Sequence, residues 1–177
     1  INGLKRLEYR GYDSAGIALL ENKKLLISKQ KGRVAELEKL NNSKIFTSTV
    51  GIGHTRWATH GVPNKINAHP HTSGDKKLAI IHNVIIENYE VLKKALETKG
   101  HNFKSETDTE VLIHLIEEIK RNDKVDLLEA VRLALNEIIG AYAIVIAEEG
   151  NTEELIVARK GSPIVIGLGK GEYFIAS

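Results

Sequence analysis

The stretch "AYAIVIAEEGNTEELIVARKGSPIVIGLGKGEYFIAS", residues 141–177, decides the fold class. It holds four apolar runs separated by short polar turns: 141–148, 154–159, 163–169 and 172–177. Strands this close together pair as antiparallel hairpins, because a parallel crossover needs a dozen or more connecting residues. The run "GLGKGE", 167–172, resembles a phosphate loop only superficially. No helix follows it, so we expect a hairpin turn there.

Two helices are expected before these strands. "SETDTEVLIHLIEEIKRN", 105–122, begins with Thr107 and Glu110 at the spacing of a capping box. Its apolar positions recur with helical period at Val111, Leu112, Leu115, Ile116 and Ile119. In "VDLLEAVRLALNEI", 125–138, the same period runs through Leu128, Val131, Leu135 and Ile138.

The first hundred residues mix both kinds of element. We expect strands at 15–21 and 24–30, around a turn at Asn22 and Lys23, and further strands from 50 and at 78–83. Helices are expected up to Gly11, at 33–41 and at 89–100. Strands, then central helices, then strands indicate an α+β sandwich.

Composition limits the possible functions. The chain has 177 residues, 42% of them hydrophobic, which suits one domain with a packed core. The formal net charge is only +2 and no basic block stands out, so binding to nucleic acid or to a membrane through bulk charge is not indicated. Cysteine is absent, which excludes disulfides and a thiol nucleophile within these residues. Methionine is absent too, even at the first position, so we expect an internal piece of a longer chain.

The stretch "HTRWATHG", 54–61, is too polar for a core strand and too rich in special residues for an idle loop. Metal binding is one interpretation of the histidines around it, which are His54, His60, His69 and His71. Their spacings of six, nine and two residues do not match a zinc helix, and Pro70 interrupts any helix there. We therefore expect no metal or other cofactor, and histidines that hold a folded loop together.

Other polar residues allow both a structural and a functional interpretation. Arg56 presents a fork of donors that suits a carboxylate, although an ordinary salt bridge is the common case. Trp57 alone would be assigned to the core. Asp108 stabilises a helix N-terminus or binds a substrate cation. Asn83, at the end of a buried strand, is either a turn residue or an amide that stabilises an oxyanion.

Five ordered motifs carry a resemblance to a known family. They are "RLEYRGYDSAG" (6–16), "GHTRWATHG" (53–61), "NAHPH" (67–71), "HNVIIEN" (82–88) and "SETDTE" (105–110). Over essentially the whole chain, the sequence resembles the glutaminase (class II glutamine amidotransferase) domain of the glutamine–fructose-6-phosphate aminotransferase family, also called glucosamine-6-phosphate synthases. The forms YRGYDSAG and TRWATHG point to this hexosamine branch.

The resemblance implies a fold and a reaction. The fold is the N-terminal-nucleophile hydrolase sandwich, four αββα layers with two antiparallel sheets. The domain hydrolyses the side-chain amide of L-glutamine. The ammonia passes to a C-terminal sugar-phosphate isomerase domain of the same chain, which converts fructose 6-phosphate to glucosamine 6-phosphate. The nucleophile is an N-terminal cysteine whose own α-amino group serves as base. A cytoplasmic homodimer, with no nucleic-acid or membrane partner, is expected of the full-length enzyme.

The same resemblance assigns roles to eight residues. Arg56 is expected to bind the α-carboxylate of glutamine and Asp108 its α-ammonium group. Thr59 and His60 are expected to contact the substrate from a mobile loop, with Gly61 allowing the bend. Trp57 corresponds to a channel gate, and Arg10 to an arginine near the nucleophile. Asn83 and the backbone N–H of Val84 correspond to the oxyanion hole.

The sequence departs from the family at two points. The nucleophilic cysteine is expected shortly before Ile1, so residues 1–177 form an amidotransferase domain without its N-terminal strand and its C-terminal end, and this fragment is expected to be inactive. Val84 stands where the family has glycine. A β-branched residue resists φ > 0 and crowds a tight pocket, so we expect weakened amide hydrolysis.

Three alternatives remain at this stage. The chain is the glutaminase domain of a purine or asparagine amidotransferase, against which the loop with Trp57 argues. It is a catalytically impaired domain that only binds glutamine or a partner, which Val84 favours. A metal hydrolase, the third alternative, predicts stoichiometric zinc.

Overall fold

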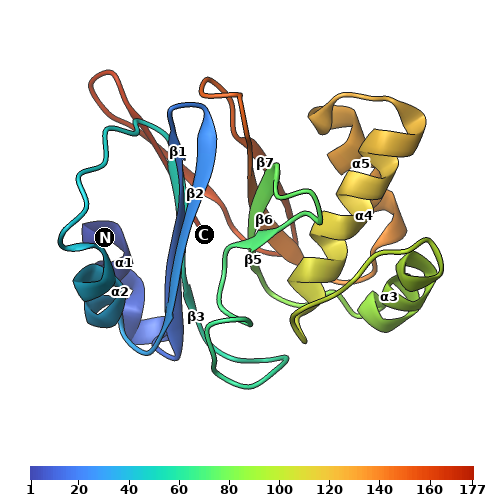
Figure 1. Ribbon diagram of the computed structural model, residues 1–177, viewed down its shortest axis with the longest axis horizontal. Helices are drawn as coiled ribbons and strands as arrows, with labels where there is room; N and C mark the ends of the chain where they lie inside the picture. Colours follow the sequence, from blue (N-terminus) through green and yellow to red (C-terminus); the bar gives the residue numbers. More distant parts are fainter.

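Two antiparallel sheets face each other in the computed structural model, which describes residues 1–177 (Figure 1). The first sheet has the order β2-β1-β3 and the second the order β4-β5-β6-β7. The first is built from β1 (Ser14–Glu21), β2 (Lys24–Lys31) and β3 (Gly51–Arg56). The second is built from β4 (His71–Thr72), β5 (Leu78–Asn83), β6 (Tyr142–Glu148) and β7 (Ile156–Lys160).

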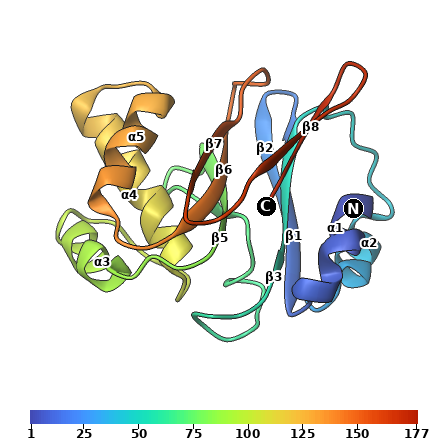
Figure 2. The same cartoon turned by 180° about the vertical axis from the view of Figure 1, so that it is seen from behind.

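Helices cover the outer face of each sheet (Figures 1 and 2). Helix α1 (Asn2–Leu7), which continues into the short 3-10 helix η1 (Glu8–Arg10), and helix α2 (Val34–Asn41) pack on the first sheet. Helix α4 (Asp108–Asp123) packs on the second, and α3 (Tyr89–Thr98) and α5 (Leu127–Glu137) pack on α4. The layers therefore run helix, sheet, sheet, helix, and the predicted αββα sandwich is confirmed.

The central strands are buried on both faces. In β6, Ile144 and Ile146 face the helical layer, whereas Val145 and Ala147 face the other sheet. This arrangement explains why β6 reads as a continuous apolar run although it belongs to an antiparallel sheet, in which alternation of apolar and polar residues is common. The core of the helical side is completed by a row on α4, namely Leu112, Ile113 and Ile116, each fully buried.

Local signals in the sequence account for most element boundaries. Asn22 and Lys23 both have positive φ, 50° and 63°, and form the two-residue turn between β1 and β2. This turn sets the register in which Ser14 faces Lys31. Thr107 caps α4 by accepting a hydrogen bond from the N–H of Glu110. The expected return bond of the capping box is absent, because the Glu110 carboxylate instead accepts from the N–H groups of Lys104 and Ser105.

Two details of the prediction are wrong or incomplete. Leu128 is 62% exposed, because the buried face of α5 is formed by Leu127, Ala130, Val131 and Ala134, shifted by one residue.

The last two strands, β8 (Val165–Leu168) and β9 (Tyr173–Ala176), form the expected hairpin, closed by a bond from the Gly169 N–H to the Glu172 carbonyl. They pair only with each other, as a separate ribbon, and do not extend either sheet.

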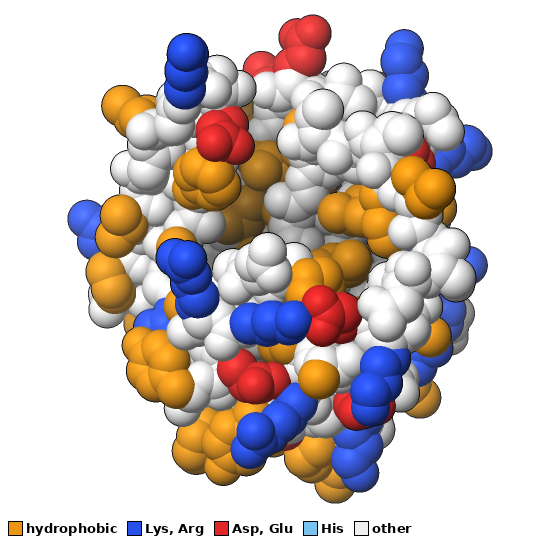
Figure 3. All heavy atoms as spheres, turned by 90° about the vertical axis from the view of Figure 1, so that its left-hand side faces the viewer, with side chains coloured by type: hydrophobic (Ala, Val, Ile, Leu, Met, Phe, Trp, Pro, Cys, Tyr) orange, Lys and Arg blue, Asp and Glu red, His pale blue; other side chains and the backbone are white.

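One face of the molecule carries no large field of one sign (Figure 3). On the face at the left of Figure 1, lysines and arginines alternate with acidic side chains, and apolar side chains lie around a hollow (Figure 3). No helix combines the length and the apolar character that crossing a bilayer requires.

A layer of histidines lies where the two sheets meet. The rings of His54 (β3) and His69 stack with centroids 4.4 Å apart, and His71 meets His69 edge-on at 4.9 Å. His82 of β5 donates its backbone N–H to the His69 ring, Nδ1 accepting at 3.3 Å. Burial lowers the pKa of His54 to about 3 and those of His69 and His71 well below their ordinary value. These rings are therefore neutral in the folded protein. As expected, His69 and His71 hydrogen-bond the end of the loop to the backbone of His82 and to the hydroxyl of Thr107, whereas Nδ1 of His54 and of His60 has no partner within the protein.

Replacing Gly16 of β1 with alanine should destabilise the protein strongly, because the backbone of His69 lies directly against this glycine. At Gly16 an added Cβ would overlap the carbonyl oxygen of His69 and lie 3.1 Å from that of Ser28. Both are backbone atoms, which cannot move away by a side-chain rotation. Gly16→Ala should therefore destabilise the protein by at least about 2 kcal/mol, a fall of about 4–8 °C in melting temperature. Thermal unfolding of the full-length protein measures this. Gly3→Ala is the matched control, because nothing lies within 4 Å of its Cβ position in α1, and alanine should be neutral or stabilising there. Equal melting temperatures for the two variants would contradict the packing described.

The buried histidines also predict a pH dependence. Because the folded-state pKa of His54 is about 3, against about 6.5 in the unfolded chain, only the unfolded state takes up its proton between these values. Stability should therefore fall as the pH drops below about 6.5, and His54 alone should cost about 2 kcal/mol at pH 5. Denaturation midpoints at pH 7.5 and pH 5.0 test this. Both pH values lie above the ordinary pKa of Asp and Glu, so most carboxylates stay ionised throughout. Equal midpoints would show that the layer takes up protons without unfolding.

Candidate active site

A cavity of about 370 Å³ opens at one end of the paired sheets. It is lined by all eight residues for which the sequence predicted a role: Arg10, Arg56, Trp57, Thr59, His60, Asn83, Val84 and Asp108. They come from four places in the fold. Arg10 ends η1, Arg56 ends β3 and leads into the loop with Trp57, Asn83 ends β5, and Asp108 begins α4.

Arg56 is buried, with 4% of its surface exposed, and it anchors the loop that follows it. Nη2 donates to the carbonyl oxygens of His60 and of Gly61, the latter at 3.1 Å. Nη1 lies 3.6 Å from the Asp13 carboxylate and makes no hydrogen bond within the protein. Nη2 thus fixes the backbone of the loop, whereas Nη1 is buried beside the Asp13 carboxylate and retains unused N–H donors.

Asp108 is buried as well, with 5% exposed, and has no lysine or arginine within ion-pair distance. Its Oδ2 accepts the N–H of Ile86 at 2.8 Å, and Oδ1 accepts the Thr109 hydroxyl at 3.4 Å. The N-terminus of α4 adds a favourable dipole. The only ionisable partner is His82, 3.8 Å away, whose pKa is lowered by burial against the opposing effect of Asp108. A buried carboxylate of this kind suits a small cationic group.

The turn after β5 places backbone and side-chain donors at the cavity. Val84 has φ = 89°, a conformation that glycine adopts readily and a β-branched residue does not. The condition under which Val84 was expected to be strained is therefore met, at a cost on the order of 1–3 kcal/mol. The side-chain amide of Asn83 is exposed rather than buried, and it donates to the Ser177 hydroxyl at 3.0 Å.

The loop between β3 and β4 contributes Trp57, Thr59 and His60 to the lining of the cavity. Trp57 is 59% exposed and meets Tyr12 edge-on with ring centroids 5.3 Å apart, so the assignment of Trp57 to the core is wrong. Thr59 is exposed, and His60 meets Tyr89 edge-on at 5.0 Å. Gly61 has φ = 77°, so the bend expected at this glycine is present.

Two residues at this site were not singled out from the sequence: Asp13, which contacts Arg56 but does not line the cavity, and Ser177, which lines it. Asp13 faces Arg56, and its Oδ1 also accepts the Ser14 hydroxyl at 2.7 Å. Its position within "YRGYDSAG" was the available signal. Ser177, whose carbonyl oxygen accepts a hydrogen bond from Arg10, follows β9 far away in the sequence, and no local pattern marks it.

Comparisons with known proteins identify the family of this chain. A family profile described as a glutamine amidotransferase domain matches residues 54–177. The chain is 61% identical over 178 residues to the glutamine–fructose-6-phosphate aminotransferase [isomerizing] of Bacteroides thetaiotaomicron, and 55% identical over 177 residues to that of Thermus thermophilus. Each alignment covers 100% of this chain but 29% of the relative, so the chain spans less than a third of their length.

Solved structures show the same architecture in a related enzyme. The glutamine phosphoribosylpyrophosphate amidotransferase of B. subtilis, in complex with ADP and GMP, superposes with a TM-score of 0.81 at 34% identity, over 98% of this chain and 37% of that one. A structure described as the allosteric regulatory enzyme of purine biosynthesis gives a TM-score of 0.84, also at 34% identity, with the same coverage. The profile match, the fold and the cavity lead to one conclusion: the chain belongs to the glutamine amidotransferase domain family.

Proposed function

We propose that this chain is the glutaminase domain of a glutamine–fructose-6-phosphate aminotransferase. In the full-length enzyme it hydrolyses the side-chain amide of L-glutamine and supplies ammonia for converting fructose 6-phosphate to glucosamine 6-phosphate. The observation that carries the proposal is the shared cavity of Arg56 and Asp108, two buried and opposite charges that no ion pair joins. An amino acid carries the matching pair of charges on its α-carbon.

The geometry suggests how glutamine would lie. Its α-carboxylate would accept hydrogen bonds from Arg56, and its α-ammonium group would donate to Asp108. The side-chain amide would then extend towards Asn83 and Val84. Thr59 and His60 would contact the substrate from the loop, and Trp57 would gate the exit of ammonia. Arg10 would lie beside the N-terminus that bears the nucleophile.

The reaction would proceed through a covalent intermediate. A cysteine thiolate outside residues 1–177 would attack the amide carbon, and the resulting oxyanion would be stabilised by the Asn83 amide and the Val84 N–H. Collapse of this intermediate would break the C–N bond, releasing ammonia and leaving a thioester. Water would hydrolyse the thioester to glutamate and restore the thiol.

The degree of identity favours the hexosamine branch over the purine branch. The aminotransferases are 55–61% identical to this chain, against 34% for the phosphoribosylpyrophosphate amidotransferase. In this proposal residues 1–177 lack the strand with the nucleophile and the end of the domain, and a sugar-phosphate isomerase domain is the partner in the same chain. A homodimer in the cytoplasm, where thiols stay reduced, completes it.

Removing the charge of Asp108 tests the proposed binding mode. Asp108→Asn keeps an acceptor for the Ile86 N–H but loses the charge that would bind the ammonium group. In the full-length enzyme, kcat/KM for glutamine should fall by about 10–100-fold, the range expected for one charge-assisted hydrogen bond. Glutamate release, measured over a range of glutamine concentrations, gives this value.

A truncated substrate makes this test specific. Glutaric acid monoamide has the carboxylate and the amide but no ammonium group, so wild type and Asp108→Asn should use it about equally well. Glu97→Gln removes an exposed charge from α3 and should leave both substrates unaffected. A loss that is equally large with the monoamide would show that Asp108 acts on the fold rather than on the ammonium group.

Replacing Val84 tests the oxyanion hole. Val84→Gly adopts φ = 89° without strain, so kcat for glutamine hydrolysis in the full-length enzyme should rise, by up to about 100-fold. Val84→Ala also resists positive φ but lacks the branched side chain, so it should stay near wild type if backbone conformation is the cause. Steady-state glutamate release measures both variants. No gain with glycine would refute the strain, and an equal gain with alanine would assign the effect to crowding.

A further inference from the structure

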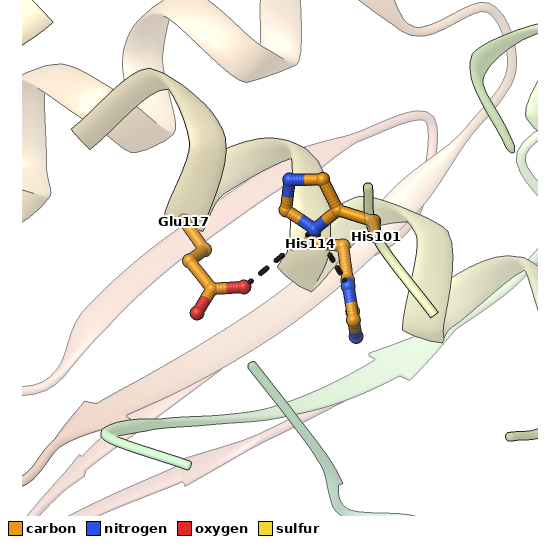
Figure 4. A group of neighbouring side chains, drawn as sticks. All are labelled: His101, His114 and Glu117. Carbon is orange, nitrogen blue, oxygen red and sulfur yellow. Dashed lines mark hydrogen bonds and ion pairs between the residues drawn. The ribbon is translucent and has the colours of Figure 1, made fainter. Parts of the chain in front are cut away.

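A second group of polar side chains lies away from the active-site cavity, where α4 meets the turn between β4 and β5 and the segment after α3. His114 and Glu117 are one turn apart on α4, and His101 reaches them from the segment after α3 (Figure 4). The ligand atoms that these three side chains offer lie within 4.8 Å of one another. Their side chains are only 4–13% exposed. This histidine–glutamate cluster lies outside all five motifs on which the glutaminase assignment rests, although the last of them, 105–110, includes the start of α4.

The two imidazole rings point the same kind of nitrogen at each other. The Nδ1 atoms of His101 and His114 are 2.9 Å apart, and Nδ1 of His101 is 3.8 Å from Oε2 of Glu117 (Figure 4). The far nitrogen of His101, Nε2, bonds to the Glu118 carboxylate at 3.0 Å. The far nitrogen of His114 lies 4.0 Å from the Glu110 carboxylate.

This pattern of partners sets the protonation of the rings. For His101, whose Nε2 bonds to Glu118, the carboxylate favours a proton on Nε2, which leaves a lone pair on Nδ1. Nδ1 of His114 faces this lone pair at 2.9 Å, so the two nitrogens share either a proton or a cation. A histidine that donates one ring N–H to a carboxylate and offers the other nitrogen inward is the usual supporting arrangement of a metal-binding histidine.

The negative charges around the cluster are only partly compensated, which favours binding of a cation. Glu118 is neutralised by Lys99, 3.4 Å away, and by Arg121. Glu110 and Glu117 have no lysine or arginine within ion-pair distance, only the two histidines. Glu117 is held by the N–H groups of Gly74 and Asp75, each at 2.9 Å, and each of its oxygens keeps a further lone pair.

We propose that His101, His114 and Glu117 bind a zinc ion through the two Nδ1 atoms and one carboxylate oxygen. A tetrahedral zinc ion with bonds of about 2.0–2.2 Å spaces its ligand atoms about 3.3 Å apart. The observed 2.9 and 3.8 Å lie on either side of this value, and all three ligand atoms lie within 4.8 Å of one another, so side-chain rotations would have to bring Glu117 and His114 closer around the ion. The cluster lines a cavity of about 410 Å³, from which water would fill the fourth position. Two imidazoles with one carboxylate favour zinc over magnesium or calcium, which prefer oxygen ligands.

The position of the ion indicates a structural role. It would tie together three segments: the chain after α3 through His101, α4 through His114, and the turn between β4 and β5 through the hydrogen bonds of Glu117. Asp108 begins the same helix, about two turns from the metal. Zinc would therefore stabilise the placement of α4 without taking part in amide hydrolysis.

Zinc binding to the full-length protein tests the proposal. After removal of metals with a chelator, the wild type should take up one more equivalent of zinc than His101→Asn, as measured by elemental analysis and by competition with a chromophoric chelator. Glu117→Gln keeps the size of the side chain and a carbonyl acceptor, and it should weaken that site at least 10-fold. Added zinc should raise the melting temperature of the wild type more than that of Glu117→Gln.

His60→Asn is the matched control, because it removes a histidine from the active-site cavity and leaves the cluster intact. It should bind zinc like the wild type. Equal zinc affinity in the wild type and in Glu117→Gln would overturn the proposal, and so would loss of the zinc in His60→Asn. No uptake by the wild type would also overturn it and would show that a proton alone joins the two rings.

Discussion

The close approach of the two sheets is the constraint on which the cavity and its residues depend. Small side chains make this approach possible: Ala18 on β1, Ala79 on β5 and Ala147 on β6 meet between the sheets, and Gly16 admits the backbone of His69. Because β3 and β5 then lie face to face, their ends bring Arg56 and Asn83 to the same cavity. Bulkier residues in this layer would separate the strand ends, and with them the groups that must act on one substrate.

Regular elements could be predicted because their signals are local. The turn at Asn22 and Lys23 and the cap at Thr107 each act within a few residues, and the structure has both. Prediction failed where a partner distant in the sequence decides. Either Leu127 or Leu128 continues a helical period, and only packing against the second sheet and α4 selects Leu127. The third and fourth apolar runs form strands as expected, but the sequence does not encode that they leave the sheets.

The candidate site was accessible from sequence for a different reason. Its residues form short, ordered motifs. A motif of adjacent residues can be recognised in the sequence even when the residues that it contacts lie far away in the chain. Asp13 was inside such a motif, yet only the fold reveals that it faces Arg56. The histidine–glutamate cluster could not be predicted from the sequence in this way. His114 and Glu117 have a visible spacing of three on one helix, but His101 joins them through tertiary structure alone.

Arg56 and Asp108 line one cavity without pairing with each other, although Arg56 forms an ion pair with Asp13. Two opposite charges in a shared cavity attract, and flexible side chains would form a salt bridge and exclude a substrate. Here each group is held by different backbone atoms: Arg56 by the carbonyl oxygens of His60 and Gly61, and Asp108 by the N–H of Ile86. The rigid ends of β3 and α4 keep these anchors apart. In the proposed binding mode, a ligand that bridges the two charges gains both interactions without first breaking one, and this preorganisation would favour an amino acid over a ligand with a single charge.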